Sequence, residues 1–322
     1  MATDPTAWFA RRTFHHTDFA DPSILIDAKG KQNLTVSVCV PALNEESTIG
    51  PIVERIRSEL VEAVPLVDEL VVIDSASADG TVEAARDAGA AVYQDREILP
   101  ELEPLRGKGE ALWKSLFVLR GDLLLWLDAD IRNFDPRFVY GPLGPLLLDP
   151  TIDYVKSFYR RPMGDGTETT LEGGRVTELV ARPVLNMFWP QLAGLVQPLS
   201  GEYAGRRTML ERIPFFTGYG VEIGMLIDIA DRFGVEAVAQ VDLEERVHRN
   251  RPIGDLSRMA FAVLHTALRR LASEGRLEAN LLPRDSMLQF EDVDGASAMR
   301  ATPIEVRERP PAISVAGYAA SR

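Results

Sequence analysis

Two aspartates at the end of an apolar run are the residues best placed to do chemistry. Asp128 and Asp130 follow the apolar residues 123–127, with one residue between them. Such a run predicts a strand buried on both faces of a parallel sheet, and ligands of these sheets bind beyond the carboxyl ends of the strands. In an extended chain, residues i and i+2 point the same way, so both carboxylates can face one Mg²⁺ or Mn²⁺ ion. The alternative is a polar turn or a helix N-cap, and the motif alone does not choose between them.

Two polar turns are predicted to follow neighbouring strands at the same edge of the sheet. The first, Pro-Ala-Leu-Asn-Glu-Glu at residues 41–46, offers backbone N–H groups and polar side chains that could read a nucleotide base. Cap preferences favour a simpler alternative, in which Asn44 or Ser47 caps the next helix. The second turn, residues 74–80, could contact a ribose or a base through Ser75, or could be only a turn rich in Asp and Ser.

A lysine between two glycines precedes a later predicted helix. Gly107 and Gly109 let the backbone approach a ligand closely, and Lys108 can then reach a phosphate. A solvated turn explains the same residues equally well, and the spacing of a P-loop is absent. Lys108 is therefore a candidate phosphate ligand whose role depends on where the fold places it.

The elements that must position these residues alternate between strand and helix. Apolar periodicity predicts strands at 34–40, 70–73, 90–93 and 122–127, and helices at 47–61, 79–88 and 109–119. The second half is less regular, with strands at 154–159 and 237–243, helices at 176–189, 221–233 and 255–272, and a flexible loop at 162–174. This alternation predicts an α/β fold with a mostly parallel, doubly wound sheet.

Composition limits the classes of function. The chain has 322 residues and a net charge of −13, which disfavours general binding to nucleic acid or to an anionic membrane. Its one cysteine, Cys39, excludes an intrachain disulfide and a zinc site built from several cysteines. No stretch approaches the roughly 20 apolar residues of a membrane span, and no signal-peptide pattern is present at the N-terminus. We therefore expect a cytoplasmic protein without nucleic-acid or membrane partners, and we expect it to be a homodimer.

Together, these motifs resemble the nucleotide-sugar half of GT-A glycosyltransferases. Segments of the second half narrow the resemblance to the glucosyl-3-phosphoglycerate synthases of actinobacteria, a family that includes enzymes making the mannosyl product; these segments are 155–162, 173–179, 197–203, 218–224 and 248–252. The resemblance spans roughly residues 34–255. It implies a GT-A fold with a nucleotide-sugar half at 34–150 and an acceptor half at 151–282. Residues 1–33 form an N-terminal extension. The tail 283–322 is expected to be extended or disordered, because its large apolar residues thin out.

The resemblance also implies roles for individual residues. The expected catalytic residues are Lys108, Asp128, Asp130 and Glu222. The expected metal ligands are Asp130 and His248, with Mg²⁺ or Mn²⁺ as the cofactor. The nucleotide-sugar site is expected to contain Pro41, Ala42, Leu43, Asn44, Glu45, Ser75, Lys108, Asp128, Leu199, Tyr219 and Glu222. The acceptor site is expected to contain Gly173, Arg175, Thr177 and Asn250, and a helix start with an Arg and a Thr suits a phosphate. The remaining histidines, His15, His16 and His265, are interpreted as structural or surface residues.

The implied reaction moves a hexose, with retention, from a nucleoside-diphosphate sugar to the 2-hydroxyl of 3-phosphoglycerate. UDP-glucose is favoured as the donor, with GDP-mannose as the alternative. Retention by double displacement needs a carboxylate nucleophile, and none is identified; Glu222 is the best candidate, although binding of the sugar hydroxyls explains it equally well. Alternatives outside this family are a polyprenyl-phosphate sugar transferase, a phosphohydrolase and a non-catalytic nucleotide-sugar sensor.

Overall fold

The computed structural model describes residues 4–163, 168–170, 174–247, 252–278, 284–293 and 296–321. Its central sheet has the strand order β1-β10-β6-β8-β5-β2-β3-β4, with β7 paired to β6. The strands are β1 (Thr13–His15), β2 (Val36–Ala42), β3 (Glu69–Asp74), β4 (Ala91–Gln94), β5 (Leu123–Trp126), β6 (Tyr154–Met163), β7 (Glu168–Thr170), β8 (Tyr203–Arg206) and β10 (Val238–Glu245). The main path is parallel except at β8, which runs antiparallel to both β5 and β6. The predicted α/β fold with a mostly parallel sheet is confirmed.

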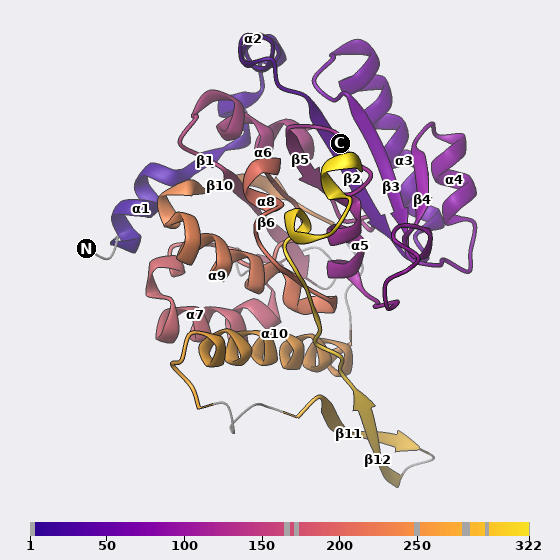
Figure 1. The fold of residues 1–322 in the computed structure, drawn as a ribbon, viewed down its shortest axis with the longest axis vertical. Helices are drawn as coiled ribbons and strands as arrows, with labels where there is room; N and C mark the ends of the chain where they lie inside the picture. Colours follow the sequence, from indigo (N-terminus) through magenta and orange to yellow (C-terminus); the bar gives the residue numbers. More distant parts are fainter. Residues whose placement is uncertain are drawn as a thin grey trace.

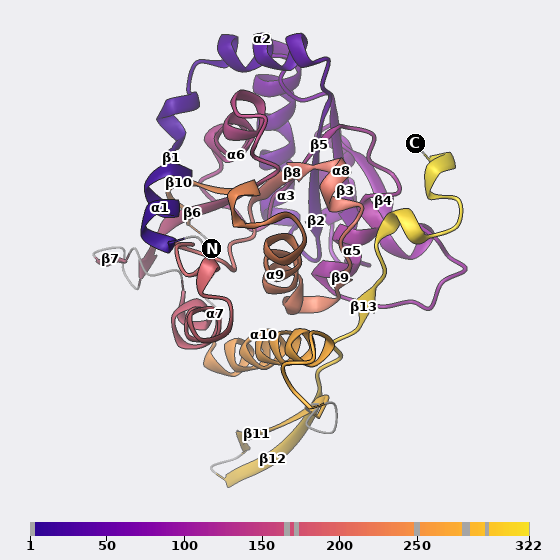
Figure 2. The same ribbon diagram turned by 60° about the vertical axis from the view of Figure 1, so that its left-hand side comes forward.

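Helices cover both faces of this sheet (Figure 1). They are α1 (Pro5–Arg12), α2 (Pro22–Gln32), α3 (Glu46–Arg55), continued by η2 (Ile56–Ala63), α4 (Thr81–Asp87), α5 (Lys108–Ser115), α6 (Arg137–Leu148), α7 (Arg182–Phe188), preceded by η4 (Thr177–Ala181), α8 (Arg207–Leu210), α9 (Val221–Phe233) and α10 (Ile253–Ser273). Figure 2 shows α10 lying across α7 and α9, on the side away from the sheet. No helix among the described residues is long and apolar enough to cross a membrane.

The alternating side chains of β5 explain why its sequence is a continuous apolar run. Leu123 and Leu125 lie in one core, with residues of α3 and α6, and Leu124 and Trp126 lie in the other, with residues of α5, α9 and α10. All four side chains are fully buried. A strand covered on both faces has no solvent-facing position to fill with a polar residue. Because β5 is buried on both faces, it fixes the position of Asp128, which lies just beyond its carboxyl end.

The N-terminal extension packs against the sheet. β1 pairs in parallel with β10 and forms the edge of the sheet. Trp8 of α1 is fully buried, and its indole N–H donates to the carbonyl of Val235 at 2.9 Å. The weak apolar pattern of this segment thus reflects a short surface layer held by a few large side chains.

The C-terminal tail is extended over much of its described length. β11 (Ser286–Val293) and β12 (Ala296–Pro303) pair as an antiparallel hairpin, which projects from the body beyond α10 in Figures 1 and 2. Farther along, β13 (Glu308–Arg309) pairs with β9 (Phe215–Phe216). The predicted flexible loop at 162–174 is wrong in part, because β6 continues to Met163 and pairs with β7. Residues 164–167 and 171–173 of that prediction lie outside the described residues.

Candidate active site

Asp128 and Asp130 share one basic partner just beyond β5. The guanidinium Nη2 of Arg246 lies 3.1 Å from Asp128 Oδ2 and also contacts Asp130 Oδ1. Arg246 directly follows β10, and both aspartate side chains are about one quarter exposed. β6 and β8 lie between β5 and β10 in the sheet, but β5 and β10 run in the same direction, so their carboxyl ends lie at the same edge. The two carboxylates therefore face one positive charge, that of Arg246, and their role as metal ligands stays a prediction.

Arg246 is itself held by buried partners from neighbouring strands. Its Nη1 donates to the Tyr159 hydroxyl at 2.8 Å, and its Nε lies 3.3 Å from Glu202 Oε1. Only about 3% of the Arg246 side chain is exposed, so these partners are needed to compensate its desolvation. Burial also raises the pKa of Glu202. No individual role was predicted for Arg246, Tyr159 or Glu202, although Tyr159 and Glu202 lie in segments that carry the family resemblance and Glu202 stands beside Gly201.

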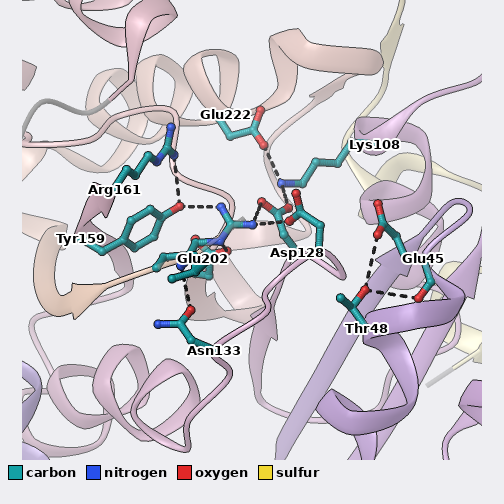
Figure 3. Close-up of polar contacts among 12 residues, drawn as sticks. Glu45, Thr48, Lys108, Asp128, Asn133, Tyr159, Arg161, Glu202 and Glu222 are labelled. Atoms are coloured by element: carbon teal, nitrogen blue, oxygen red, sulfur yellow. Dashed lines mark hydrogen bonds and ion pairs between the residues drawn. The ribbon is translucent and has the colours of Figure 1, made fainter. Parts of the chain in front are cut away.

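Lys108 completes the cluster from the opposite side, as Figure 3 shows. Its Nζ lies 2.5 Å from Asp128 Oδ1 and 3.0 Å from Glu222 Oε1. Burial alone would lower the pKa of Lys108, but the carboxylates of Asp128 and Glu222 outweigh it and raise that pKa. Burial would likewise raise the pKa of Asp128, but Lys108 and Arg246 lower it. The four residues predicted to be catalytic therefore lie in one ion-paired cluster, in which Arg246 connects Asp130 to Asp128.

Glycines allow the backbones around Lys108 to come close together. A Cβ added to Gly109 would lie 1.8 Å from the carbonyl oxygen of Phe216, and Gly107 has a positive φ of 97°. The first turn of α5 is thereby pressed against the segment that leads into α9. This contact places Lys108 within reach of Glu222, in the first turn of α9.

The turns at 41–46 and 74–80 bind each other. Asn44 Oδ1 accepts from the Ala78 N–H at 2.8 Å, the Asn44 N–H donates to Ser77 Oγ at 2.9 Å, and the Glu45 N–H donates to Thr81 Oγ1 at 2.8 Å. Asn44 adopts the left-handed region at φ 57°, which Asn tolerates better than most residues.

Capping by Asn44 or Ser47 is therefore wrong. The N-cap of α3 is Glu45, and it makes no side-chain capping bond. The turn also leaves Leu43 about half exposed. Farther along, Tyr219 lies at the surface beside α9, and Leu199 packs partly against the core.

The predicted acceptor residues fall near the edge of the described structure. Arg175 is exposed at the start of the helix that continues through η4, whereas Thr177 is only 2% exposed. Arg161 connects this helix start to the charged cluster: it lies beside Gly174, where an added Cβ would be 2.5 Å from its Nη1, and it donates to the Tyr159 hydroxyl at 3.3 Å. The predicted residues Gly173, His248 and Asn250 lie outside the described residues.

A buried lysine lies beneath the cluster. Lys156 of β6 is 1% exposed, its Nζ has no hydrogen-bond partner, and it lies 4.0 Å from the centre of the Tyr203 ring. Burial lowers the pKa of Lys156 to about 7. Lys156 was not predicted as a site residue, although a lysine inside the predicted strand 154–159 signals an unusual environment.

The aspartate pair fits a hard divalent cation. Its ligand atoms are carboxylate oxygens, which Mg²⁺ and Mn²⁺ prefer. Arg246 contacts both carboxylates, so a metal ion bound there would share them with this guanidinium. His248, the other predicted ligand, follows the same strand two residues after Arg246.

Comparisons with known proteins give the family. Residues 37–190 match the model of glycosyl transferase family 2. The chain is 49% identical over 309 residues to the glucosyl-3-phosphoglycerate synthase of Petrotoga mobilis, which covers 96% of this chain and 95% of that protein. The chain belongs to the glucosyl-3-phosphoglycerate synthase family. It is a glycosyltransferase with the GT-A fold, as the resemblance implied, and this assignment favours a transferase over the phosphohydrolase and sensor alternatives.

Solved structures of this family are similar over nearly the whole chain. Mannosyl-3-phosphoglycerate synthase from Rubrobacter xylanophilus has a TM-score of 0.88 at 41% identity, covering 96% of this chain and 97% of that one. Glucosyl-3-phosphoglycerate synthase from Mycobacterium tuberculosis, in complex with Mn²⁺, UDP and phosphoglyceric acid, has a TM-score of 0.82 at 41% identity. The match covers 94% of this chain and 98% of that one. The similarity includes the N-terminal segment and the tail, which lie outside the sequence motifs.

Proposed function

We propose that this glycosyltransferase moves glucose from UDP-glucose to the 2-hydroxyl of 3-phosphoglycerate and that it requires Mg²⁺ or Mn²⁺. The observation that carries the proposal is the cluster of Lys108, Asp128, Asp130 and Arg246 at the carboxyl edge of the sheet. It lies in a chain that is 41% identical to a synthase solved with Mn²⁺, UDP and phosphoglyceric acid. Carboxylates beside two cationic side chains suit a diphosphate and the metal ion that accompanies it.

The donor is proposed to lie along the carboxyl ends of β2, β3 and β5. Its base and ribose would meet the turns at 41–45 and Ser75, and Tyr219, Leu199 and Glu222 would contact the rest of the donor. Lys108 would bind the diphosphate while remaining close to Asp128. When bound by Asp130 and His248, the metal ion supplies further positive charge for the leaving nucleoside diphosphate.

Glu222 is proposed to bind the sugar rather than to attack it. Its carboxylate is 3.0 Å from Lys108 Nζ and only about 8% of the side chain is exposed. An ion-paired carboxylate is a weaker nucleophile than a free one, because its negative charge is already stabilised. Glu222 therefore suits orientation of the sugar hydroxyls and of Lys108. The acceptor proton can pass to the departing phosphate.

The acceptor is proposed to bind near the start of the helix at 175–188. Arg175 and the helix N-terminus suit the phosphate and carboxylate of 3-phosphoglycerate, together with Gly173 and Asn250. Thr177 is buried in the described state, so its hydroxyl reaches the acceptor only if this helix start rearranges on binding.

Transfer of mannose from GDP-mannose is the second candidate function. The structure of the Rubrobacter xylanophilus enzyme, named a mannosyl-3-phosphoglycerate synthase, supports it through a TM-score of 0.88. Glucose and mannose differ in the orientation of one hydroxyl, so a small change around the sugar can exchange them.

A donor panel tests both candidates. Purified protein is incubated with 3-phosphoglycerate, Mg²⁺ and UDP-glucose, GDP-mannose or ADP-glucose in turn, and the product is identified by mass spectrometry and NMR. We expect glucosyl-3-phosphoglycerate from UDP-glucose at the highest kcat/KM. A higher kcat/KM with GDP-mannose would establish the second candidate, and no transfer from any donor would refute both.

A further inference from the structure

Two histidines and a glutamate meet at the edge of the sheet, outside the proposed active site. His15 ends β1 and His16 begins the 3-10 turn η1 (His16–Phe19), while Glu244 lies near the end of β10. Figures 1 and 2 show β1 beside β10, and His15 is in register with Asp242. The Nε2 atoms of His16 and His15 lie 3.3 Å and 3.8 Å from Glu244 Oε1.

The backbone is arranged to bring these three side chains together. Successive residues of a regular strand point to opposite faces. The change from strand to 3-10 turn instead places both imidazole rings on one side, with ring centroids 4.6 Å apart. Glu244 adopts φ 66°, rare for a residue other than Gly or Asn, where the register of β10 against β6 shifts. Strained backbone of this kind is often retained for function.

We propose that His15, His16 and Glu244 form a second metal site, for Zn²⁺ or a similar late first-row divalent cation. One ligand atom from each residue lies within 4.8 Å of the others. Ligand atoms on a tetrahedral Zn²⁺ with bonds of about 2.0–2.1 Å lie roughly 3.4 Å apart, close to the two histidine–glutamate separations of 3.3 Å and 3.8 Å. Two nitrogens and one carboxylate oxygen are a known ligand set for Zn²⁺ that leaves a fourth position open.

The surroundings of the histidines support ligation through Nε2. His16 is 7% exposed, and its buried Nε2 faces the carboxylate of Glu244 at 3.3 Å. Its Nδ1 lies 3.1 Å from the Tyr140 hydroxyl. The Nδ1 of His15 lies 2.7 Å from Thr17 Oγ1 and also accepts from the Thr17 backbone N–H at 3.3 Å. A ligating histidine donates its far ring N–H to an acceptor. Zn²⁺ binding through His15 Nε2 therefore requires that Nδ1 carry the proton, donate it to Thr17 Oγ1 and give up the longer contact with the Thr17 N–H. In both rings, Nε2 is therefore the nitrogen directed at Glu244.

The nitrogen ligands also separate this site from the aspartate pair. Imidazole favours Zn²⁺ over Mg²⁺, whereas Asp128 and Asp130 offer only oxygen. Arg137 Nη1 lies 3.5 Å from Glu244 Oε2, so it contacts the carboxylate oxygen that faces away from the histidines. Its positive charge lowers the affinity for a cation but leaves Oε1 available.

A metal ion bound here would restrict the motion of the chain between Glu244 and Arg246, which leads into the active site. Glu244 lies two residues before Arg246, the partner of Asp128 and Asp130. Fixing Glu244 to β1 and η1 would restrict the end of β10. We therefore assign the site a structural role that holds Arg246 in position.

The test measures Zn²⁺ binding to the full-length chain, without a histidine tag and after treatment with a chelator. The protein used for this test is the variant Asp130→Asn/His248→Gln, which lacks the proposed metal ligands of the active site. Isothermal titration calorimetry should then show one Zn²⁺ per chain, not displaced by excess Mg²⁺, and Co²⁺ should give the strong visible absorption of a tetrahedral site.

Adding His15→Gln or Glu244→Gln should weaken Zn²⁺ binding by about tenfold or more. Both side chains are about 39% exposed, so these variants are expected to fold, and circular dichroism checks that they do. His265→Gln is the matched control and should leave Zn²⁺ affinity unchanged. Absence of Zn²⁺ binding, or equal affinity with and without His15 and Glu244, would show that the cluster is an ordinary histidine–carboxylate contact.

Discussion

At the scale of single residues, the site is a set of charges that neutralise one another. Asp128 lies between Lys108 and Arg246, and Arg246 lies among Asp128, Asp130 and Glu202. Removing one member leaves another buried charge without compensation. Single substitutions in this cluster therefore disturb partners as well as the ligand that each residue is proposed to bind.

Asp130→Asn tests the proposed metal ligand. The amide keeps the shape but loses the charge that faces Arg246 and the metal ion, so we expect kcat to fall by about 100-fold or more. Initial rates measured over a range of Mg²⁺ and Mn²⁺ concentrations check this, and the apparent metal affinity should also fall. Asp87→Asn, at an exposed position of α4, is the matched control. An unchanged kcat in Asp130→Asn would remove this residue from the metal site.

Lys156→Met tests the buried lysine through the pH dependence of stability. The pKa of Lys156 is about 7 in the folded state and near 10.5 in the unfolded chain, so the unfolded state binds more protons between these values. Lys156 should therefore make the free energy of unfolding increase as pH rises from 7 toward 10, by up to about 1.4 kcal/mol per pH unit. Urea unfolding at pH 7 and pH 9 measures it. The increase should be smaller in Lys156→Met, and equal slopes in both proteins would contradict a lowered pKa.

At the scale of elements, the site depends on how closely backbones approach one another. Gly201 lies just before β8, the one antiparallel strand on the main path of the sheet, and faces the carboxylate of Asp128. Gly109 lets the first turn of α5 meet the strand β9 in the same way. These contacts decide where Asp128 and Lys108 can lie.

Gly201→Ala should displace Asp128. The added Cβ would lie 1.9 Å from Asp128 Oδ2, so the carboxylate must move away from Lys108 and Arg246. We expect kcat to fall by about tenfold or more, because a displacement of about 1 Å in a site can cost 100-fold. Gly30→Ala is the matched control, since an added Cβ there meets nothing within 4 Å and should preserve activity. Wild-type kcat in Gly201→Ala would show that the site tolerates the displacement.

At the scale of the whole molecule, the C-terminal segment stabilises the helix that carries Lys108. Arg309 of β13 makes a bidentate contact with Glu110 of α5, at 2.8 Å and 2.7 Å, across 199 residues of sequence. Glu110 is fully buried, so this ion pair lies in the interior. Similarity to solved structures over nearly the whole chain agrees with a tail that belongs to the folded unit.

Arg309→Gln tests this connection. In this variant, Lys114, at 3.5 Å, is the remaining ion-pair partner of the buried Glu110 carboxylate among the described residues. We expect the free energy of unfolding to fall by about 3 kcal/mol. Activity should fall with it if α5 shifts Lys108. Arg307→Gln is the matched control, because its ion pairs are about half exposed and contribute at most about 1 kcal/mol. Equal denaturation midpoints for the two variants would contradict a stabilising role for the buried pair.

The homodimer and the cytoplasmic location stay predictions.

The sequence by itself determined the order of strands and helices in residues 34–127 and the main acidic and basic candidates. Fully buried strands such as β5 have a strong local pattern, so residues 34–127 could be assigned from periodicity. Lys108, Asp128 and Glu222 were identified from motifs and resemblance. Only the tertiary structure decided that β8 runs antiparallel, that β1 and β13 pair with distant segments, and that Arg246, Glu202 and Lys156 surround the aspartates. Pairing between distant segments and compensation of buried charge depend on which side chains meet in space, and neither leaves a periodic signal along the chain.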